Sequence, residues 1–250
     1  MLELWINNST VAKKKPVQSG LLDNDCKFTI ASKSLVDCSE IKEGGQNHWA
    51  VKFAGDNQTW FIYKPHVVVK WNRLITFRHF KACFIYANKD LINVYFEPVN
   101  QVLHEFEINT VQRIAAFLAQ IAHETCSLRY REEIASGQAY EWRKDLGNIY
   151  RGDGRRYKGR GLIQLTGRHN YTWASRSLGI DLVNNPKLAA DPLVGARIAG
   201  LYWSSRNLNK YADWHNLKGF RVITRKINGG FNGWNDRLSH WKRIKKVLCC

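Results

Sequence analysis

The chain has 250 residues, of which 44% are hydrophobic and 24% charged, the composition of a globular protein with one or two domains. No apolar stretch approaches the roughly 20 residues of a membrane-spanning helix, so we expect no stable insertion into a membrane. The formal net charge of +17 is uneven, because residues 1–71 hold 9 Lys and Arg against 7 Asp and Glu, whereas residues 72–250 hold 29 against 14. This excess favours a polyanionic partner such as nucleic acid, anionic lipid or an acidic cell wall.

Residues 1–70 are predicted to form a small all-β domain. Residues 51–53 and 59–63 read as two strands of a hairpin around the polar turn 55–58, and residues 66–69 predict a closing strand. The size and strand rhythm resemble the SH3-like barrels that often accompany cell-wall hydrolases, which implies binding to the wall. The alternative is a spacer that binds no ligand.

Residues 72–250 are predicted to be mainly α-helical, because the spacing of apolar residues changes to the helical period. Asn109 as N-cap, with Gln112 three residues later, predicts the start of the best-defined helix. Asp191 followed by Pro192 predicts the start of another helix, and the last helix is expected to begin near Asn235–Asp236.

The best-defined helix ends in a carboxylate on its apolar side. Glu124 lies seven positions after Phe117, within about 20° of it around the helix axis. Burial there disfavours the ionised form, which suits a general acid at neutral pH. The alternative is a structural carboxylate that is paired with an arginine.

A glycosidase needs a second carboxylate, and Glu132 and Glu133 follow closely. A continuous helix would place Glu133 half a turn away from Glu124 and about 13 Å further along the axis. This interpretation therefore requires the helix to end near Cys126–Ser127 so that the two glutamates face each other. Inverting enzymes hold their carboxyl groups about 6.5–9.5 Å apart and retaining enzymes about 5–5.5 Å apart, and spacing along the chain does not decide between them.

The glycine-rich segment 152–171 matches neither of two phosphate-binding patterns, the Walker spacing and G-x-G-x-x-G. Its glycines permit a tight backbone close to a ligand. Gln164, Thr166 and Asn170 are neutral hydrogen-bonding groups of the kind that bind sugar hydroxyls and acetamides. The alternative is an ordinary polar loop.

Several segments resemble, in order, the signature segments of family 19 glycoside hydrolases, which comprise chitinases and phage-type endolysins. They are residues 123–125, Glu133, residues 157–166 and residues 227–230. The resemblance implies an α-helical, lysozyme-like catalytic domain with inverting chemistry and with neither a metal nor another cofactor.

On this resemblance, Glu124 is the general acid that protonates the glycosidic oxygen. Glu133 is the general base that activates water. It follows the pattern of the compact members, since plant-type members place their second glutamate much further downstream. The adjacent Glu132 is its rival for this role. Thr166 matches the hydroxyl that helps to hold this water.

The same resemblance implies further site residues. Gln164, Asn170 and Asn228 fall where members of the family contact the sugars of the substrate. Arg237 matches an arginine that pairs with the base carboxylate and keeps it ionised. His169 stands where plant-type members often have Tyr, so it receives no role.

The charge of residues 72–250, the SH3-like domain and the likeness to compact endolysins favour bacterial peptidoglycan as the substrate. Residues 1–8 lack the pattern of a signal peptide, so we expect the protein to be made in the cytoplasm. We also expect it to be a monomer. It would act on the cell wall or periplasm after release by a pore-forming holin or a secretion machine. We expect it to clear a peptidoglycan suspension and to leave colloidal chitin nearly untouched.

Three alternatives to this function were weighed. A chitinase would act on the same type of bond in a neutral polymer. A nucleic-acid-binding protein would also suit the charge, but no helix-turn-helix, RNA-recognition or zinc motif is present, so we expect no nucleic acid as partner. An inactive wall-binding relative is disfavoured because both glutamates and Thr166 are present.

The six cysteines form no CxxC pair, so free thiols are expected. A disulfide between Cys26 and Cys38 is the alternative.

Overall fold

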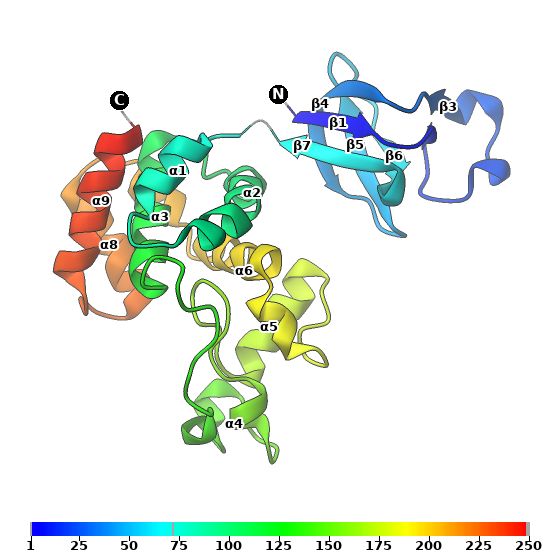
Figure 1. Cartoon of the computed structure of the whole chain (residues 1–250). Helices are drawn as coiled ribbons and strands as arrows, with labels where there is room; N and C mark the ends of the chain where they lie inside the picture. The colour runs from blue at the N-terminus through cyan, green and yellow to red at the C-terminus, as the bar shows by residue number, and fades with distance from the viewer. Residues whose placement is uncertain (1, 72, 249–250) are drawn as a thin grey trace. The chain divides into compact units, whose positions relative to one another are not determined.

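A computed structural model describes residues 2–71 and 73–248 of the chain, which divides into two compact units, Met1–Asn72 and Arg73–Cys250. The first unit is all β and the second is mainly α-helical (Figure 1). None of the helices in the described residues has the length and apolar character that a membrane crossing requires.

The first unit is a seven-stranded antiparallel sheet with the order β3-β2-β6-β5-β4-β1-β7. The predicted hairpin is confirmed, because β5 and β6 pair with Val51 opposite Trp60. The predicted closing strand is also present as β7, which pairs with β1. The strands are β1 (Leu2–Ile6), β2 (Thr10–Lys13), β3 (Lys27–Ile30), β4 (Ser34–Glu43), β5 (His48–Phe53), β6 (Trp60–Tyr63) and β7 (Val67–Trp71).

The sheet has a small apolar core and two edge strands, β3 and β7. Leu4, Ile6, Val51 and Ile62 are fully buried in this core. β4 changes partner from β1 to β5 across an irregularity between Cys38 and Glu40, which bends the long strand. Among the described residues no pairing joins β3 to β7, so the sheet is not shown to close into the expected barrel.

The second unit contains nine α-helices within residues 73–248. They are α1 (Phe77–Cys83), α2 (Lys89–Glu105), α3 (Val111–Glu124), α4 (Asp153–Arg156), α5 (Arg168–Leu178), α6 (Pro192–Ser205), α7 (Leu208–Ala212), α8 (Leu217–Asn228) and α9 (Trp234–Leu248). Short 3-10 turns occur in both units. In the first unit they are Ser19–Leu21, Asn24–Cys26 and Lys64–His66, and in the second unit they are Gln138–Tyr140, Lys144–Leu146 and Pro186–Ala190.

The central helix of this unit is α3, with α9 packed along it (Figure 1). Every residue from Ile114 to Ala122 is buried, and small alanines on α3 allow neighbouring helices to approach closely. The Phe117 ring meets Trp203 of α6 edge-on, with ring centroids 5.4 Å apart. Phe117 and Trp203 are therefore part of the hydrophobic core of this unit.

Helix starts follow the sequence closely, with one correction. Asp191 caps α6 by accepting from the backbone N–H of Leu193 and Val194, as predicted. The cap of α3 is Thr110, whose hydroxyl accepts from the N–H of Arg113, so the prediction of Asn109 as N-cap is wrong by one residue. Both residue types make good caps, and the backbone of the preceding turn selects the threonine.

The cysteines in the described residues are free thiols. Cys26, Cys38, Cys83 and Cys126 form no disulfide, so the predicted state is confirmed for these four and the Cys26–Cys38 bridge is not formed. Cys249–Cys250 lies outside the described residues.

Candidate active site

The helix that carries Glu124 ends immediately after it, as the glycosidase interpretation requires. Cys126, Ser127 and Leu128 have φ values of 47°, 59° and 68°, a run of left-handed backbone that no helix can continue. The Ser127 N–H donates to the Ala122 carbonyl at 2.7 Å and ties the reversal to the last turn of α3. The expected end near Cys126–Ser127 is confirmed, so the two glutamates do not share one continuous helix.

An arginine of α9 holds the Glu124 carboxylate. The Arg237 guanidinium donates to Glu124 Oε1 at 2.6 Å and to Gln120 Oε1 at 2.5 Å, and it is 1% exposed. The Glu124 side chain is 23% exposed, so its carboxylate is a paired group at the rim of an apolar stripe. The expectation that Arg237 pairs with the base carboxylate is wrong, because α9 packs along α3 and brings the guanidinium to Glu124.

A second pair lies beside the first on the same two helices. His123 Nδ1 is 2.6 Å from Asp236 Oδ2, so consecutive residues of α3 bond consecutive residues of α9. Gly233 lies against the His123 ring, and a Cβ there would be 2.1 Å from its Cε1 atom. Glu124 is therefore positioned by tightly packed neighbours on both helices.

Glu133 is held by the loop that follows the reversal. Its Oε1 accepts from the Tyr140 hydroxyl at 3.0 Å, and its Oε2 accepts from the Gly159 N–H at 3.1 Å. Burial, followed by the bond to Glu133, raises the pKa of Tyr140 and keeps its hydroxyl a donor. Tyr140 was not predictable from the sequence, since nothing in the order of residues 134–158 indicates which of them returns to Glu133.

Glu132 points to a different set of partners. Its Oε1 lies 3.2 Å from both Lys158 Nζ and Arg160 Nε. Burial alone would raise the pKa of Glu132, but the hydrogen bond from Lys158 and the charges of Lys158 and Arg160 together lower it. The rival carboxylate is thus engaged in ion pairs, whereas the Glu133 carboxylate accepts from two neutral donors, Tyr140 and Gly159.

Gly159 is the point where three predicted site residues meet. A Cβ at this position would lie 2.7 Å from Gln164 Oε1, 3.2 Å from Glu133 Oε2 and 3.3 Å from Thr166 Oγ1. The Thr166 hydroxyl donates to the Gln164 carbonyl at 2.8 Å, which leaves its oxygen as an acceptor. The structure therefore gathers Glu133, Gln164 and Thr166, as the sequence predicted.

A polar hollow of about 480 Å³ begins at this cluster. Gln164, Thr166 and Asn170 line it, and the Asn170 side-chain amide donates to the Thr166 carbonyl at 2.8 Å. Sequence reasoning missed Trp173 and Tyr202, which supply apolar ring surface to the hollow. Rings of this kind are a usual stacking surface for sugars.

Ile163 and Tyr202 connect the hollow to Glu124. Both line the 480 Å³ hollow, and both also line the small apolar niche that contains Glu124. Burial raises the pKa of Tyr202, and the Glu124 charge contributes to this rise. The two carboxylates thus belong to neighbouring parts of one region.

Asn228 lies apart from the hollow at the last position of α8. Its side-chain amide nitrogen is buried and, among the described residues, has no hydrogen-bond partner. A buried donor without a partner is costly, so this group needs a ligand or a water to accept from it.

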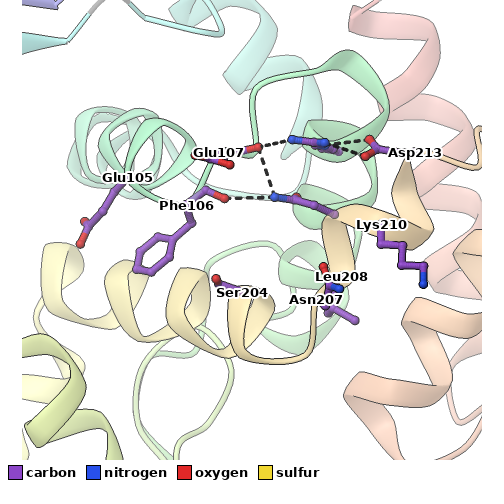
Figure 2. Close-up of a pocket in the computed structure, with 10 residues that line it drawn as sticks. Glu105, Phe106, Glu107, Ser204, Asn207, Leu208, Lys210 and Asp213 are labelled. Atoms are coloured by element: carbon purple, nitrogen blue, oxygen red, sulfur yellow. Dashed lines mark hydrogen bonds and ion pairs between the residues drawn. The ribbon is translucent and has the colours of Figure 1, made fainter. Parts of the chain in front are cut away.

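A further hollow of about 690 Å³ near the end of α2 is structural in character (Figure 2). Arg113 donates two hydrogen bonds to Asp213 and one to the Glu107 carbonyl. Asn209 donates to the carbonyls of Phe106 and Glu107. These polar groups satisfy one another and fasten α7 to the start of α3.

The arrangement provides two separately held carboxyl groups, a hydroxyl and neutral amides. These groups are suited to acid and base catalysis on a polyhydroxylated substrate. Within residues 2–71 and 73–248, no group of three or more His, Cys, Asp and Glu side chains lies together in a way that could hold a metal ion.

Comparison with known proteins finds relatives of the helical unit. The family model described as Chitinase class I matches residues 105–218, which include Glu124, Glu133 and Thr166. The chain is 31% identical over 175 residues to endochitinase 1 of Theobroma cacao, which covers 55% of this chain and 54% of that protein. An endochitinase of Solanum tuberosum is 32% identical over 183 residues, covering 57% and 54%. The chain spans about half the length of these curated relatives.

Solved structures extend the likeness to most of the helical unit. Chitinase C from Streptomyces griseus superimposes with a TM-score of 0.59 at 25% identity, covering 70% of this chain and 93% of that one. A second bacterial family 19 chitinase gives a TM-score of 0.56 at 25% identity, covering 70% and 95%. Through its helical unit, the chain is similar in sequence and in fold to these family 19 chitinases.

Proposed function

We propose that the helical unit hydrolyses β-1,4 bonds beside N-acetylglucosamine in a chitin-type polymer. The observation that carries this proposal is the pair of glutamates on the two sides of a chain reversal, with Glu133 beside Thr166 and Gln164. The relatives named above are endochitinases, which supports chitin ahead of the peptidoglycan favoured by sequence alone.

The proposed reaction is a single inverting displacement. Arg237 bonds Glu124 Oε1, so the proton of the acid form is carried by Oε2, which donates it to the glycosidic oxygen as the bond between this oxygen and the anomeric carbon breaks. A water on the opposite face of the sugar gives its proton to Glu133 and adds its oxygen to the anomeric carbon. Arg237 orients the Glu124 carboxyl, and Tyr140 with the Gly159 N–H orients Glu133. The oxygen of Thr166 accepts a hydrogen bond from the attacking water.

Substrate sugars would occupy the hollow next to this cluster. Gln164 and Asn170 face hydroxyl and acetamide groups there, and Trp173 offers a ring for stacking. Asn228, which does not line this hollow, is proposed to contact a different sugar of the polymer.

Peptidoglycan remains a second candidate substrate because residues 72–250 carry 29 Lys and Arg against 14 Asp and Glu. Chitin is neutral and does not use this charge, whereas bacterial walls are acidic. On this alternative the N-terminal sheet would be an SH3-like module that binds the wall.

The test compares the wild-type chain with Glu124→Gln and Glu133→Gln on soluble chito-oligosaccharides. Each substitution should lower kcat by about a thousandfold, since a positioned acid or base contributes roughly this much. Glu97→Gln, at an exposed glutamate of α2, is the matched control and should retain activity. The first product seen by NMR should be the α-anomer. Wild-type rates in both variants, or a β-anomer, would refute the mechanism.

The substrate is decided by a second measurement with the same proteins. Release of soluble sugar from colloidal chitin should exceed release of muropeptides from peptidoglycan. If peptidoglycan is the better substrate and Glu124→Gln abolishes its cleavage, the mechanism stands and the choice of chitin is wrong. If neither polymer is cut and duplex DNA is bound, the protein is a nucleic-acid-binding protein.

A further inference from the structure

The exposed side of α8 carries a group of cations that lies outside the candidate active site. Residues 214–250 contain 9 Lys and Arg and a single acidic residue, Asp236. We call four exposed cations the α8 cationic face: Lys218, Arg221, Arg225 and Lys226. Within the part of the chain that the structure describes, none of these four forms an ion pair with a carboxylate. Their charge is therefore not neutralised inside the unit.

Three of these cations make one continuous surface. At about 100° per residue, Lys218, Arg221 and Arg225 lie within about 60° of one another and extend over about 10 Å of the helix axis. Lys226 lies about 80° from Lys218, at the edge of this surface. The opposite side of α8 is buried in the unit through Gly219, Phe220, Ile223 and Thr224. The helix is thus amphipathic, with core on one side and positive charge on the other.

Helix stability explains only part of this charge. Lys218 is in the first turn of α8, where the helix dipole disfavours a cation, and no acidic residue lies in that turn. Arg225 and Lys226 are in the last turn, where the dipole favours them. Because at least one of the four charges opposes helix formation, an external anionic partner explains the face better than folding does.

Apolar side chains stand exposed beside the cations. Leu217 is 49% exposed, Trp214 40% and Phe231 39%. The Arg221 guanidinium lies over the Phe231 ring at 4.6 Å from its centroid. At the surface of an anionic membrane, such apolar groups enter the headgroup region while cations meet lipid phosphates. A nucleic acid would use the cations but has no place for an exposed leucine.

We propose that the α8 cationic face binds anionic phospholipid surfaces and lies flat on them without crossing them. The occupant is a phosphate-bearing lipid headgroup layer, met by Lys218, Arg221 and Arg225, with Leu217 and Phe231 at the headgroup boundary. This surface would add a lipid attachment that the proposed glycosidase reaction does not need.

The test is cosedimentation of the full chain with phosphatidylcholine vesicles prepared with and without phosphatidylglycerol. The full chain should bind the anionic vesicles and leave the neutral ones. Lys218→Gln/Arg225→Gln should weaken binding roughly thirtyfold, because each cation near an anionic surface contributes about fivefold. Lys89→Gln/Arg176→Gln removes the same charge from exposed residues of α2 and α5 and should change binding little.

A third variant separates lipid from nucleic acid. Leu217→Asn should weaken vesicle binding severalfold and leave any binding of duplex DNA unchanged. Equal losses in the two double variants would overturn the proposal, and so would equal binding to neutral vesicles or an unchanged affinity in Leu217→Asn. Far-ultraviolet circular dichroism and chito-oligosaccharide hydrolysis check that the variants stay folded.

Discussion

The two candidate carboxylates are held by different kinds of structure. Glu124 ends a buried helix, and a guanidinium of a second packed helix fixes it through a charged hydrogen bond. Glu133 lies in a loop and is bound by a tyrosine hydroxyl and one backbone N–H. The comparison indicates that the proposed acid depends on packing between helices, whereas the proposed base depends on the shape of a loop.

The loop has its own support, far from α3 and α9. Asp153, at the start of α4, is 1% exposed and accepts from the N–H groups of Ile149 and Tyr150 and from the Arg168 guanidinium. In Figure 1, α4 lies at the end of the helical unit opposite α1. Substitutions at the α3–α9 contact should therefore disturb Glu124, whereas substitutions near α4 should disturb the loop that holds Glu133.

The largest effect is expected from Arg237→Leu. The substitution leaves Gln120 and Glu124 without their guanidinium, and removing one member of a buried ion pair typically costs about 3 kcal/mol of the free energy of unfolding. Chemical denaturation measures this cost. Arg143→Leu removes an exposed ion pair with Asp145 and is the control, expected to leave the midpoint almost unchanged. Equal midpoints for the two variants would contradict a special role of the α3–α9 contact.

Next in size is the effect of Asp153→Asn on the loop region. Burial alone would raise the pKa of Asp153, but the hydrogen bond and charge of Arg168 and the two backbone N–H groups together lower it below 3.8. A lowered pKa means that the ionised carboxylate contributes stability above pH 3.8, which is lost as the pH falls through the folded value. The variant should be less stable by about 2 kcal/mol at pH 6.

Thermal unfolding at several pH values checks the direction in which the stability contributed by Asp153 changes with pH. The difference in Tm between the wild-type chain and Asp153→Asn should be largest near neutral pH and should shrink below pH 3.8. Asp181→Asn is the matched control, since Asp181 is exposed and accepts hydrogen bonds from groups close to it in the sequence. A difference in Tm that grows on acidification would show that the Asp153 charge does not support the loop.

Much of the Glu124 side of the site was predictable, because it follows from local rules. The apolar stripe of α3, the carboxylate at its end and the break near Cys126–Ser127 all depend on residues close in sequence. The partner of Arg237 was predicted wrongly because it depends on how α9, over a hundred residues later, packs along α3. Sequence distance carries no information about that register.

The Glu133 side was less predictable for the same reason. The bond from Tyr140 and the contacts at Gly159 arise from a loop with little regular structure, whose path follows from many separate hydrogen bonds. In the first unit, the strand pattern identified the β5–β6 hairpin, but closure of the sheet depends on its two distant edges, β3 and β7.

Gly159→Ala should have a moderate effect that is confined to activity. The added methyl group would crowd Gln164 Oε1, Glu133 Oε2 and Thr166 Oγ1, all at the ends of side chains that can shift. Small displacements of catalytic groups cost roughly tenfold to a hundredfold, so kcat should fall by about tenfold with little change in Tm. Gly20→Ala has open space around it and should leave kcat unaltered.

The smallest effect is expected from Glu132→Gln, which tests the choice between adjacent glutamates. Glu132 pairs with Lys158 and Arg160 at a partly exposed position, and such pairs contribute about 0–1 kcal/mol to stability. Because its carboxylate bonds these cations while Glu133 bonds Gly159 and Tyr140, kcat on chito-oligosaccharides should stay close to that of the wild-type chain. A large loss of kcat in Glu132→Gln together with a small loss in Glu133→Gln would assign the base to Glu132. It would also mean that the neutral donors around Glu133 serve the loop and not the attacking water.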